Sequence, residues 1–368
     1  MIFRCDLVPQ YEAYKKEIDE AIQRVLYSGR YILGSEVAEF EKEFARYIGV
    51  KYAVSVANAT DGLTLSLMAL GIKEGDEVIT TPFTAIPTVS AIIDSGATPV
   101  FVDINPHTYL LDISKVVSAI TSKTRAIMPV HIFGNVVDIP ALRDIAGQDI
   151  PVIEDASQAH GSKLNDVQSG SMGDIGVFSF YPTKNLGGYG DGGIVVTNKE
   201  EIAEKIKLLR MYGMIDKDRI IINGINSRLD ELQAAILGIK LKFLDEMNLK
   251  RNIIAGRYLK ELRKDLFEHQ LIPDNVYSNY HVFVSKFKYN RERFIQYLEK
   301  REIQTNIYYP IPLYLQKANE FLGLKKGALP VVEELCEKVI ALTMYPELKQ
   351  DKLDYIIDSI NSYGEHEI

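Results

Sequence analysis

The stretch from Ser179 to Gly193 places one lysine, Lys184, between an aromatic and hydroxyl-bearing run and a glycine-rich turn. Apolar, β-branched residues flank the stretch, which indicates two strands that hold the lysine between them. A lysine that is desolvated in such a place loses its proton more readily and becomes a nucleophile toward an aldehyde. A lone lysine is ordinarily exposed to solvent, so this interpretation depends on what the rest of the chain supplies.

Three glycines of the same stretch, Gly188, Gly190 and Gly193, match the spacing of a dinucleotide-binding fingerprint. That fingerprint must open a helix, so that the pyrophosphate meets a helix N-terminus, whereas a β-branched run follows here. The glycines therefore predict a tight turn with close backbone approach. They argue against a nicotinamide-dependent sugar reductase.

Two other places carry groups that complement a reactive lysine. Asp155 ends the apolar run 151–155, and a carboxylate at a strand end either holds a heteroaromatic N–H⁺ in its charged form or caps the next turn. Residues 57–62 form a small polar turn that contains Ala59 and Thr60, between a strand-like run and a helical one. Free backbone N–H groups at such a turn bind anions, although the same pattern also serves as an ordinary helix cap.

Composition limits the classes of partner. The 368 residues are 46% hydrophobic and 25% charged with a formal net charge of −8, and no block of like charge stands out. We therefore expect no binding to nucleic acid or to an anionic membrane surface. No apolar run approaches the roughly eighteen residues of a membrane span, and we expect a cytoplasmic protein. Cys5 and Cys336 form neither a disulfide framework nor metal-ligand spacing, so we expect no metal.

Strand-like runs alternate with helical runs of about ten residues from Tyr52 to Asp155. This alternation predicts an α/β fold with a mostly parallel sheet between helices, and ligands of such sheets bind beyond the carboxyl ends of the strands. The pattern changes near residue 245 to a smaller α+β unit. We expect a large domain over 1–245 and a small domain over 246–368, with a strand at 305–309.

A lysine between strands, a carboxylate at a strand end and a helix N-terminus suited to phosphate are together what pyridoxal 5′-phosphate requires. The chain resembles the sugar aminotransferases of the DegT/DnrJ/EryC1/StrS family, which have the aspartate aminotransferase fold. The resemblance covers nearly the whole length. Its most specific blocks are Glu154-Asp155-Ala156-Ser157-Gln158-Ala159-His160-Gly161, Pro182-Thr183-Lys184-Asn185-Leu186-Gly187, Gly190-Asp191-Gly192-Gly193 and Asn226-Ser227-Arg228-Leu229-Asp230-Glu231-Leu232-Gln233-Ala234-Ala235.

The resemblance implies a role for each matching residue. Lys184 forms the imine with the cofactor and afterwards moves the proton, Asp155 pairs with the pyridinium, and Gln158 bonds the ring hydroxyl. The phosphate is held by three residues of the same chain and by one from a second subunit, so a homodimer with shared active sites is implied. These phosphate-binding residues are Ala59, Thr60 and Ser179, with Asn226 reaching across from the second subunit.

Some positions depart from the family pattern. Ala85 stands where many relatives have an aromatic residue that stacks on the cofactor, and we expect Phe83 to take that role. The loop after the C-terminal strand commonly carries histidines where this chain has tyrosines. Aromatic residues that could contact the substrate are Tyr31, Tyr181, Tyr308 and Tyr314. His131 and His160 lie in matching motifs, and we interpret both as structural.

The resemblance predicts transfer of an amino group, by the family's habit from L-glutamate, to a nucleotide-linked keto sugar. The blocks around Gly187 and Arg228 resemble those of enzymes acting on dTDP-linked 3-keto-6-deoxyhexoses more than those acting on 4-keto sugars. UDP and GDP stay open as nucleotides. A PLP-dependent sugar dehydratase and a non-catalytic regulator are alternatives. The first usually has histidine in place of Lys184, and the second usually carries an added DNA-binding or sensor segment.

Overall fold

The main sheet of the computed structural model, which describes residues 1–364, consists of two hydrogen-bonded groups of strands. One group has the order β1-β9-β8-β5 and the other the order β3-β2-β4. Parallel bridges of Ile127 with Val152 and of Val130 with Asp155 join the β4 edge to the β5 edge. Across the sheet the strands are β1 (Tyr52–Val56), β9 (Gly193–Thr197), β8 (Ile175–Ser179), β5 (Ile153–Asp155), β4 (Thr124–Met128), β2 (Glu77–Thr80) and β3 (Thr98–Phe101).

The direction of the strands follows from their connections. β2 is parallel to β3 and β4, and β5 is parallel to β8. β9 is antiparallel to both of its neighbours, β1 and β8, because it follows β8 through the turn at 180–192 without a crossover helix. The predicted α/β fold with a mostly parallel sheet is confirmed. A strand follows the glycines, so the turn at Gly188 does not open a helix, as predicted.

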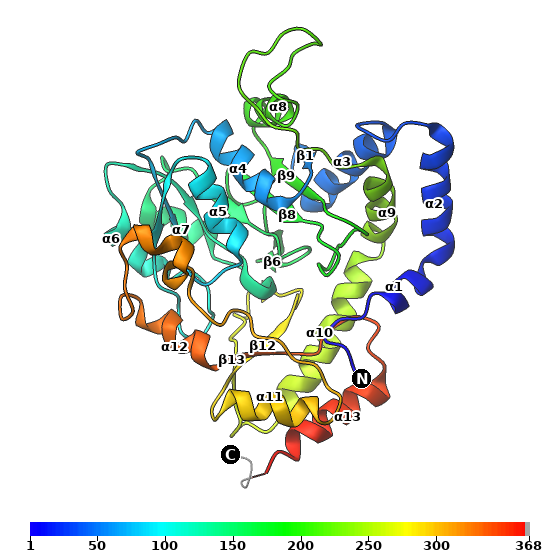
Figure 1. The fold of residues 1–368 in the computed structure, drawn as a ribbon, viewed down its shortest axis with the longest axis vertical. Helices are drawn as coiled ribbons and strands as arrows, with labels where there is room; N and C mark the ends of the chain where they lie inside the picture. The colour runs from blue at the N-terminus through cyan, green and yellow to red at the C-terminus, as the bar shows by residue number, and fades with distance from the viewer. Residues whose placement is uncertain (365–368) are drawn as a thin grey trace.

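Helices cover both faces of this sheet (Figure 1). Successive residues of a strand point to opposite faces, and apolar residues lie on both faces here. Phe178, Ile194 and Val196 pack with α3 and α9, whereas Val177 and Val195 pack with α4. The helices around the sheet are α2 (Lys15–Ser28), α3 (Ser35–Ile48), α4 (Ala59–Ala69), α5 (Ile86–Asp94), α6 (Val116–Ala119), α7 (Ile139–Ala146), α8 (Glu200–Leu209) and α9 (Glu231–Leu241).

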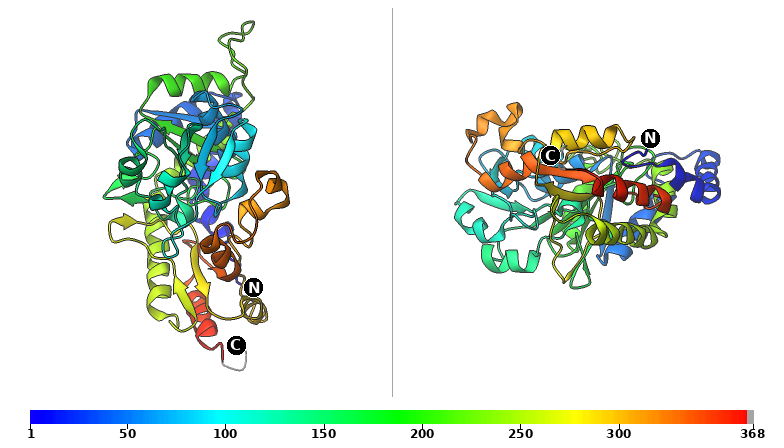
Figure 2. Two further views of the ribbon diagram at one scale, coloured as in Figure 1. Left: turned by 90° about the vertical axis from the view of Figure 1, so that its left-hand side faces the viewer. Right: turned by 90° about the horizontal axis from the view of Figure 1, so that it is seen from below.

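The C-terminal part is a second layered unit on α10 (Leu244–Glu261), below the main sheet in Figure 1 and seen from two further sides in Figure 2. Its antiparallel sheet has the order β10-β12-β13, and helices pack on it around a second apolar core. The elements are β10 (Phe267–His269), β12 (Phe283–Phe287), β13 (Val339–Leu342), α11 (Arg291–Glu299) and α13 (Gln350–Asn361).

Two segments cross the proposed boundary between the domains at residue 245. Ile2 pairs with Ile303 and is buried in the C-terminal core, so the first residues of the chain pack with the last third. Conversely, Val332 and Leu335 of α12 (Pro330–Lys338) pack in the same core as Ile79 of the main sheet. The division into a large domain over 1–245 and a small domain over 246–368 stays a proposal about where the boundary lies in the sequence. It does not describe every contact.

Some local predictions differ from the structure. Residues 305–309 form no strand and have only a bridge between Asn306 and Ala341, because proline residues follow at once in the chain. The helical residues after Asp230 are divided near Phe243 into α9 and α10. The short elements are α1 (Val8–Ala13), β6 (Lys163–Leu164), β7 (Val167–Gln168) and β11 (Val276–Tyr277). Within residues 1–364, no helix has the length and apolar content that crossing a membrane requires.

Candidate active site

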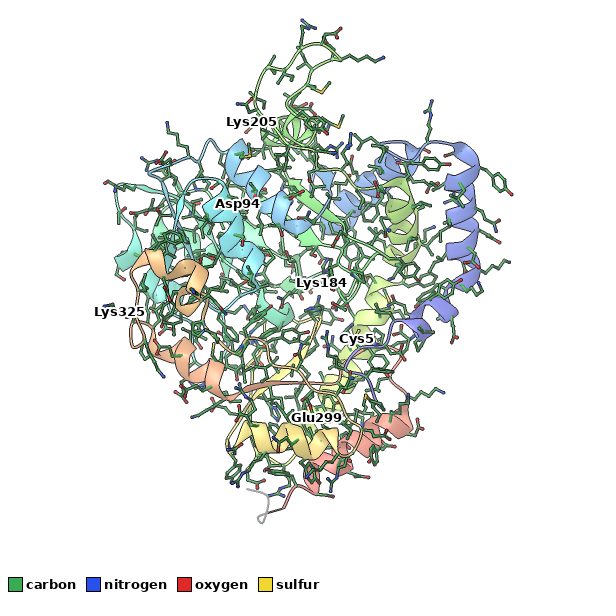
Figure 3. The ribbon with its side chains drawn as sticks, viewed as in Figure 1. Cys5, Asp94, Lys184, Lys205, Glu299 and Lys325 are labelled. Carbon is green, nitrogen blue, oxygen red and sulfur yellow. The ribbon has the colours of Figure 1, made fainter. Side chains whose placement is uncertain are left out.

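Lys184 lies in the turn between β8 and β9, near the middle of the molecule and between its two sheets (Figure 3). Its side chain reaches a cavity of about 240 Å³ at the carboxyl ends of β5 and β8. The structure brings most of the predicted residues together there, as expected for a site beyond the strand ends. Those that line the cavity are Ala59, Thr60, Asp155, Gln158, Ser179, Tyr181 and Lys184.

The amine of Lys184 is poised for reaction near neutral pH. Removal from water lowers its pKa to about 8, and the negative charge of Asp155 limits the decrease. At pH 7 roughly one molecule in ten then carries a neutral amine at this position, far more than for a lysine in water. Lys184 therefore has the properties of a nucleophile toward an aldehyde.

Asp155 is 4% exposed, and both of its carboxylate oxygens accept hydrogen bonds. Oδ2 accepts from Thr88 Oγ1 at 2.7 Å, and Oδ1 accepts from the backbone N–H of Ser157 at 3.2 Å. The main chain of Asp155 also bonds Pro129 and His131 at the end of β4. The carboxylate is thus fixed at the cavity wall with a negative charge directed toward the ligand space.

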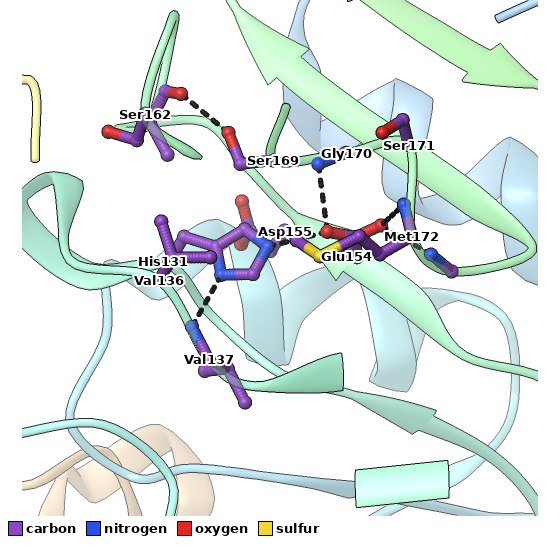
Figure 4. Close-up of polar contacts among 12 residues, drawn as sticks. His131, Val136, Val137, Glu154, Asp155, Ser162, Ser169, Gly170, Ser171 and Met172 are labelled. Atoms are coloured by element: carbon purple, nitrogen blue, oxygen red, sulfur yellow. Dashed lines mark hydrogen bonds and ion pairs between the residues drawn. The ribbon is translucent and has the colours of Figure 1, made fainter. Parts of the chain in front are cut away.

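Glu154, the residue before Asp155, fixes this end of β5 through several hydrogen bonds (Figure 4). Glu154 is fully buried and accepts hydrogen bonds from the backbone N–H groups of Gly170 and Met172, both at 2.8 Å. The N–H of Val137 donates to His131 Nδ1 at 3.0 Å, so the ring hydrogen is on Nε2, which donates to Glu154 at 2.7 Å. His131 is therefore structural, in agreement with its exclusion from the catalytic set.

The N-terminus of α4 forms the opposite wall of the cavity. The Asn58 side chain accepts from the N–H of Asp61 at 2.9 Å, which leaves the first two helical amides, of Ala59 and Thr60, without an acceptor inside the helix. A Cβ at Gly193 would lie 2.7 Å from the nitrogen of Ala59, so glycine is needed where β9 passes this helix. These amides and the nearby Ser179 hydroxyl make a site for a phosphate group.

Gln158 and Phe83 differ in their relation to the cavity. The Gln158 side chain accepts from the N–H of Phe133 at 2.8 Å and donates to the hydroxyl of Tyr309 at 3.2 Å, with its amide at the cavity wall. Phe83 is 1% exposed, and its ring packs edge-on against Tyr109, Phe133 and Tyr309. The stacking role expected of Phe83 is corrected: it supports the wall from the core.

A second cavity of about 250 Å³ shares Lys184, Gln158 and Tyr181 with the first and extends toward the C-terminal sheet. Tyr308 lines this cavity, as a substrate contact would. Tyr314 does not reach it. Its side chain is 1% exposed in the apolar core beside Phe101, and its hydroxyl donates to Glu333. The expectation that Tyr314 contacts substrate is therefore corrected.

Two predicted residues lie away from the cavities of their own chain. Tyr31 is 48% exposed in the connection between α2 and α3, and its hydroxyl approaches the carbonyl of Leu26. Asn226 is exposed in the segment between α8 and α9, beside a bridge to Met211. Neither is among the residues that line either cavity. For Asn226 this agrees with the prediction that it acts from a second subunit, and the substrate contact of Tyr31 stays a prediction.

Sequence reasoning missed several residues that the structure brings to the cavities. Thr88 follows Thr84 by one helical turn, a spacing that could have indicated a polar face on α5. Arg4 and Tyr309 line the second cavity although one is near the start of the chain and the other near its end. No local pattern indicates either, because the contact depends on how the two ends meet.

Comparison with known proteins identifies the family of the chain. The model of the DegT/DnrJ/EryC1/StrS aminotransferase family matches residues 12–361. The chain belongs to this family. It is 44% identical over 352 residues to dTDP-3-amino-3,6-dideoxy-alpha-D-galactopyranose transaminase of Aneurinibacillus thermoaerophilus, covering 95% of this chain and 96% of that one. It is 40% identical over 367 residues to a protein of Geobacillus stearothermophilus named pleiotropic regulatory protein, with 98% of each covered.

Among solved structures, DesV of S. venezuelae in complex with a ketimine intermediate superposes with a TM-score of 0.96 at 39% identity, covering 99% of this chain and 98% of that one. The family assignment confirms the predicted aminotransferase activity and pyridoxal 5′-phosphate as the cofactor. The residues present fit that group. The cavity offers an amine of lowered pKa, a fixed carboxylate and unpaired helix amides on its walls.

Proposed function

We propose that this aminotransferase moves an amino group from an amino acid to a nucleotide-linked keto sugar. The observation that carries the proposal is the placement of Lys184, with its lowered pKa, in one cavity with Asp155 and the N-terminus of α4. A second cavity next to the lysine offers space for the two substrates in turn. The name of the relative from A. thermoaerophilus supports an amino-sugar product, and the name of the family supports transfer of an amino group.

Each residue has a defined task in this proposal. When bound, pyridoxal phosphate supplies a conjugated ring that accepts the electron pair left when a C–H bond beside the amine breaks. Lys184 holds the cofactor and, once released, takes and returns that proton as a general base and acid. Asp155 keeps the ring nitrogen protonated, while Ala59, Thr60 and Ser179 bind the phosphate. Gln158 donates to the ring hydroxyl through the amide that contacts Tyr309.

For the substrate we propose a dTDP-linked 3-keto-6-deoxyhexose, with L-glutamate as the amino donor. The relative from A. thermoaerophilus is named for an amino group at carbon 3, which supports this position. A 4-keto sugar and a UDP or GDP carrier are the alternatives. Lys184 argues against dehydration of the sugar, and also against a purely regulatory role, although one relative is named for regulation.

We also propose a homodimer in which Asn226 of the partner subunit completes the phosphate site. The support is that Asn226 is exposed and outside the cavity of its own chain. The segment after α8, which extends beyond the body of the molecule at the top of Figure 1, also exposes Ile215, Ile220 and Ile221. Exposed apolar groups of this kind are typical of association surfaces. Light scattering and mixed dimers of Asn226→Ala with Lys184→Ala test the shared site.

The main experiment separates the two halves of the reaction. The protein loaded with cofactor is treated with L-glutamate, excess donor is removed, and dTDP-linked 3-keto and 4-keto sugars are added separately while the cofactor absorbance is followed. We expect the original spectrum to return with the 3-keto sugar and not with the 4-keto sugar. Return with the 4-keto sugar alone would overturn the position, and absence of any change in Lys184-containing protein would overturn the activity.

A further inference from the structure

The second cavity is also lined by residues that lie outside the four most specific family blocks. Besides Lys184 and Gln158, this cavity is lined by Arg4, His281 and Tyr308. Arg4 comes from the first residues of the chain, which pack on the C-terminal sheet 300 residues later in sequence. A cation is thus built into the wall of a space that begins at the reactive amine.

The position of Arg4 is fixed on both sides of its backbone. Its N–H donates to Gln304 Oε1 at 3.3 Å, and its carbonyl accepts from the N–H of Met344 at 3.2 Å. The side chain is fixed as well, because Nη1 donates to the hydroxyl of Tyr308, and the guanidinium carbon lies 5.9 Å from the centre of that ring. The guanidinium is therefore held in place before any ligand arrives.

Within the described residues, the guanidinium of Arg4 has no carboxylate as an ion-pair partner. Among the ion pairs of residues 1–364, none includes Arg4. Burial is the main cause that lowers the pKa of the His281 ring, and the positive charges of Lys184, Arg251 and Arg4 lower it further. Arg251 does not line the second cavity, and its Nη1 donates to the carbonyls of Tyr280, His281 and Met344. Arg4 is the arginine that lines this cavity, and its remaining N–H groups can serve an anion.

We propose that Arg4 binds a carboxylate of the amino donor, and so sets the position of the donor relative to Lys184. The inference rests on the proposed transfer from an amino acid. An amino acid carries a carboxylate on the carbon that must react beside Lys184, whereas a neutral sugar ring carries no charge near its carbonyl. A planar guanidinium matches a carboxylate through two parallel hydrogen bonds, and a partly buried cation without an anion favours such a ligand.

The kinetic test uses Arg4→Gln and Arg4→Lys in the cofactor-loaded protein, with Arg293→Gln on the exposed face of α11 as the matched loss of one positive charge. The donor and acceptor halves are followed separately. For Arg4→Gln we expect the half-saturating L-glutamate concentration to rise about tenfold or more, as for loss of a charge-assisted bond. Arg4→Lys should recover part of this loss, and Arg293→Gln should match the wild type.

The acceptor half-reaction shows whether the anion that Arg4 binds belongs to the amino donor or to the sugar nucleotide. We expect its half-saturating sugar concentration to stay within about twofold of the wild type in Arg4→Gln, because the proposal assigns no sugar contact to this residue. An equal loss in both halves, or a loss in the acceptor half alone, would overturn the proposal in favour of an anionic group on the sugar nucleotide. An unchanged donor half would overturn it outright.

A binding measurement keeps the inference separate from the proposed function. Glutarate has the two carboxylates of glutamate but no amine, so it cannot react, and its affinity is measured by calorimetry. Weaker glutarate binding in Arg4→Gln than in Arg293→Gln supports the Arg4 site even if no sugar is ever aminated. Equal binding in the two variants contradicts it even if the enzyme is active. Tyr308→Phe retains the charge and tests positioning, and we expect a smaller loss than for Arg4→Gln.

Discussion

The hydroxyl of Thr88 donates a 2.7 Å hydrogen bond to Oδ2 of Asp155 across 67 residues of sequence. Thr88 has one hydroxyl hydrogen, so the 2.8 Å contact between its oxygen and that of Thr84 requires Thr84 to donate. Both threonines are 1% exposed. The carboxylate at the cavity wall is thus oriented by a short chain of hydroxyl groups from the loop before α5 and its first turn.

Thr88→Val removes this donor while it preserves the shape of the side chain. The carboxylate of Asp155 then loses a hydrogen bond that water cannot easily replace at a 4% exposed position. We expect the free energy of unfolding of the cofactor-free protein to fall by about 1.5–3 kcal/mol, measured by urea denaturation. Thr98→Val at the exposed start of β3 is the control. Equal stability of the two variants would contradict a role for Thr88 in holding Asp155.

The lowered pKa of Lys184 predicts a specific pH dependence for its reaction with aldehydes. The neutral amine reacts, and its fraction rises with pH up to the pKa of about 8 and then levels off. We expect the rate at which cofactor-free protein captures a small aldehyde, trapped with borohydride at the peptide of Lys184, to rise about tenfold from pH 6 to 7. The rate should be nearly constant above pH 9.

The reference for this measurement is a lysine amide in the same solution that is acetylated on its α-amine and keeps its side-chain amine free. The pKa of that side-chain amine is about 10.4, so its rate of reaction rises over the whole pH range of the experiment. The variant Lys184→Ala should give no labelled peptide at this position. A midpoint near 10 for Lys184 would show that the cavity leaves the amine fully solvated, and the proposed nucleophile would lose its main support.

The sequence was sufficient to predict several residues that line the first cavity, because each depends on a local pattern. Asp155 follows an apolar strand, Lys184 lies between two β-branched runs, and Ala59 with Thr60 begins a helix after a strand. These positions converge through the geometry of any parallel sheet, whose carboxyl ends lie on one edge. The fold class followed from the same alternation of strands and helices.

The residues that surround these groups could not be predicted in the same way. Phe83 and Tyr314 are aromatic residues beside motif positions, and only the packing decides that both point into the core. Arg4 reaches the second cavity because Ile2 pairs with Ile303, a contact between the two ends of the chain. Side-chain direction and pairing over some 300 residues leave no periodic signal in a single sequence.

Glu154→Gln tests the support beneath Asp155. The buried carboxylate accepts from the N–H groups of Gly170, Met172 and Gly173 and from His131, whereas an amide at this place would direct its own N–H hydrogens at donors. We expect the free energy of unfolding to fall by about 3–5 kcal/mol, as when one partner of a buried charged network is removed. Glu337→Gln, at a 67% exposed side chain, is the control. A loss below about 1 kcal/mol would contradict this network.

The buried Lys240 predicts how stability changes in mildly alkaline solution. It is 1% exposed on α9, and Nζ donates to the carbonyl of Gly187 in the turn that carries Lys184. Burial lowers its pKa from 10.5 to about 8, so the charged form costs free energy in the folded state. Below pH 8 the lysine is protonated whether folded or unfolded, and the whole cost is present. Between pH 8 and 10.5 only the unfolded chain holds the extra proton, and the cost disappears.

Because the unfolded state binds more protons in this window, the free energy of unfolding should rise with pH relative to a variant that lacks the amine. Against Lys240→Met, we expect the cofactor-free wild type to gain about 1.4 kcal/mol per pH unit and about 3 kcal/mol in total, from urea denaturation at pH 7.5, 8.5, 9.5 and 10.5. Subtracting the variant removes the titration of Lys184 and of the tyrosines, which both proteins share. A difference in the free energy of unfolding between the two proteins that stays constant across the series would show that Lys240 keeps its ordinary pKa. Its amine at the turn of Gly187 would then be hydrated.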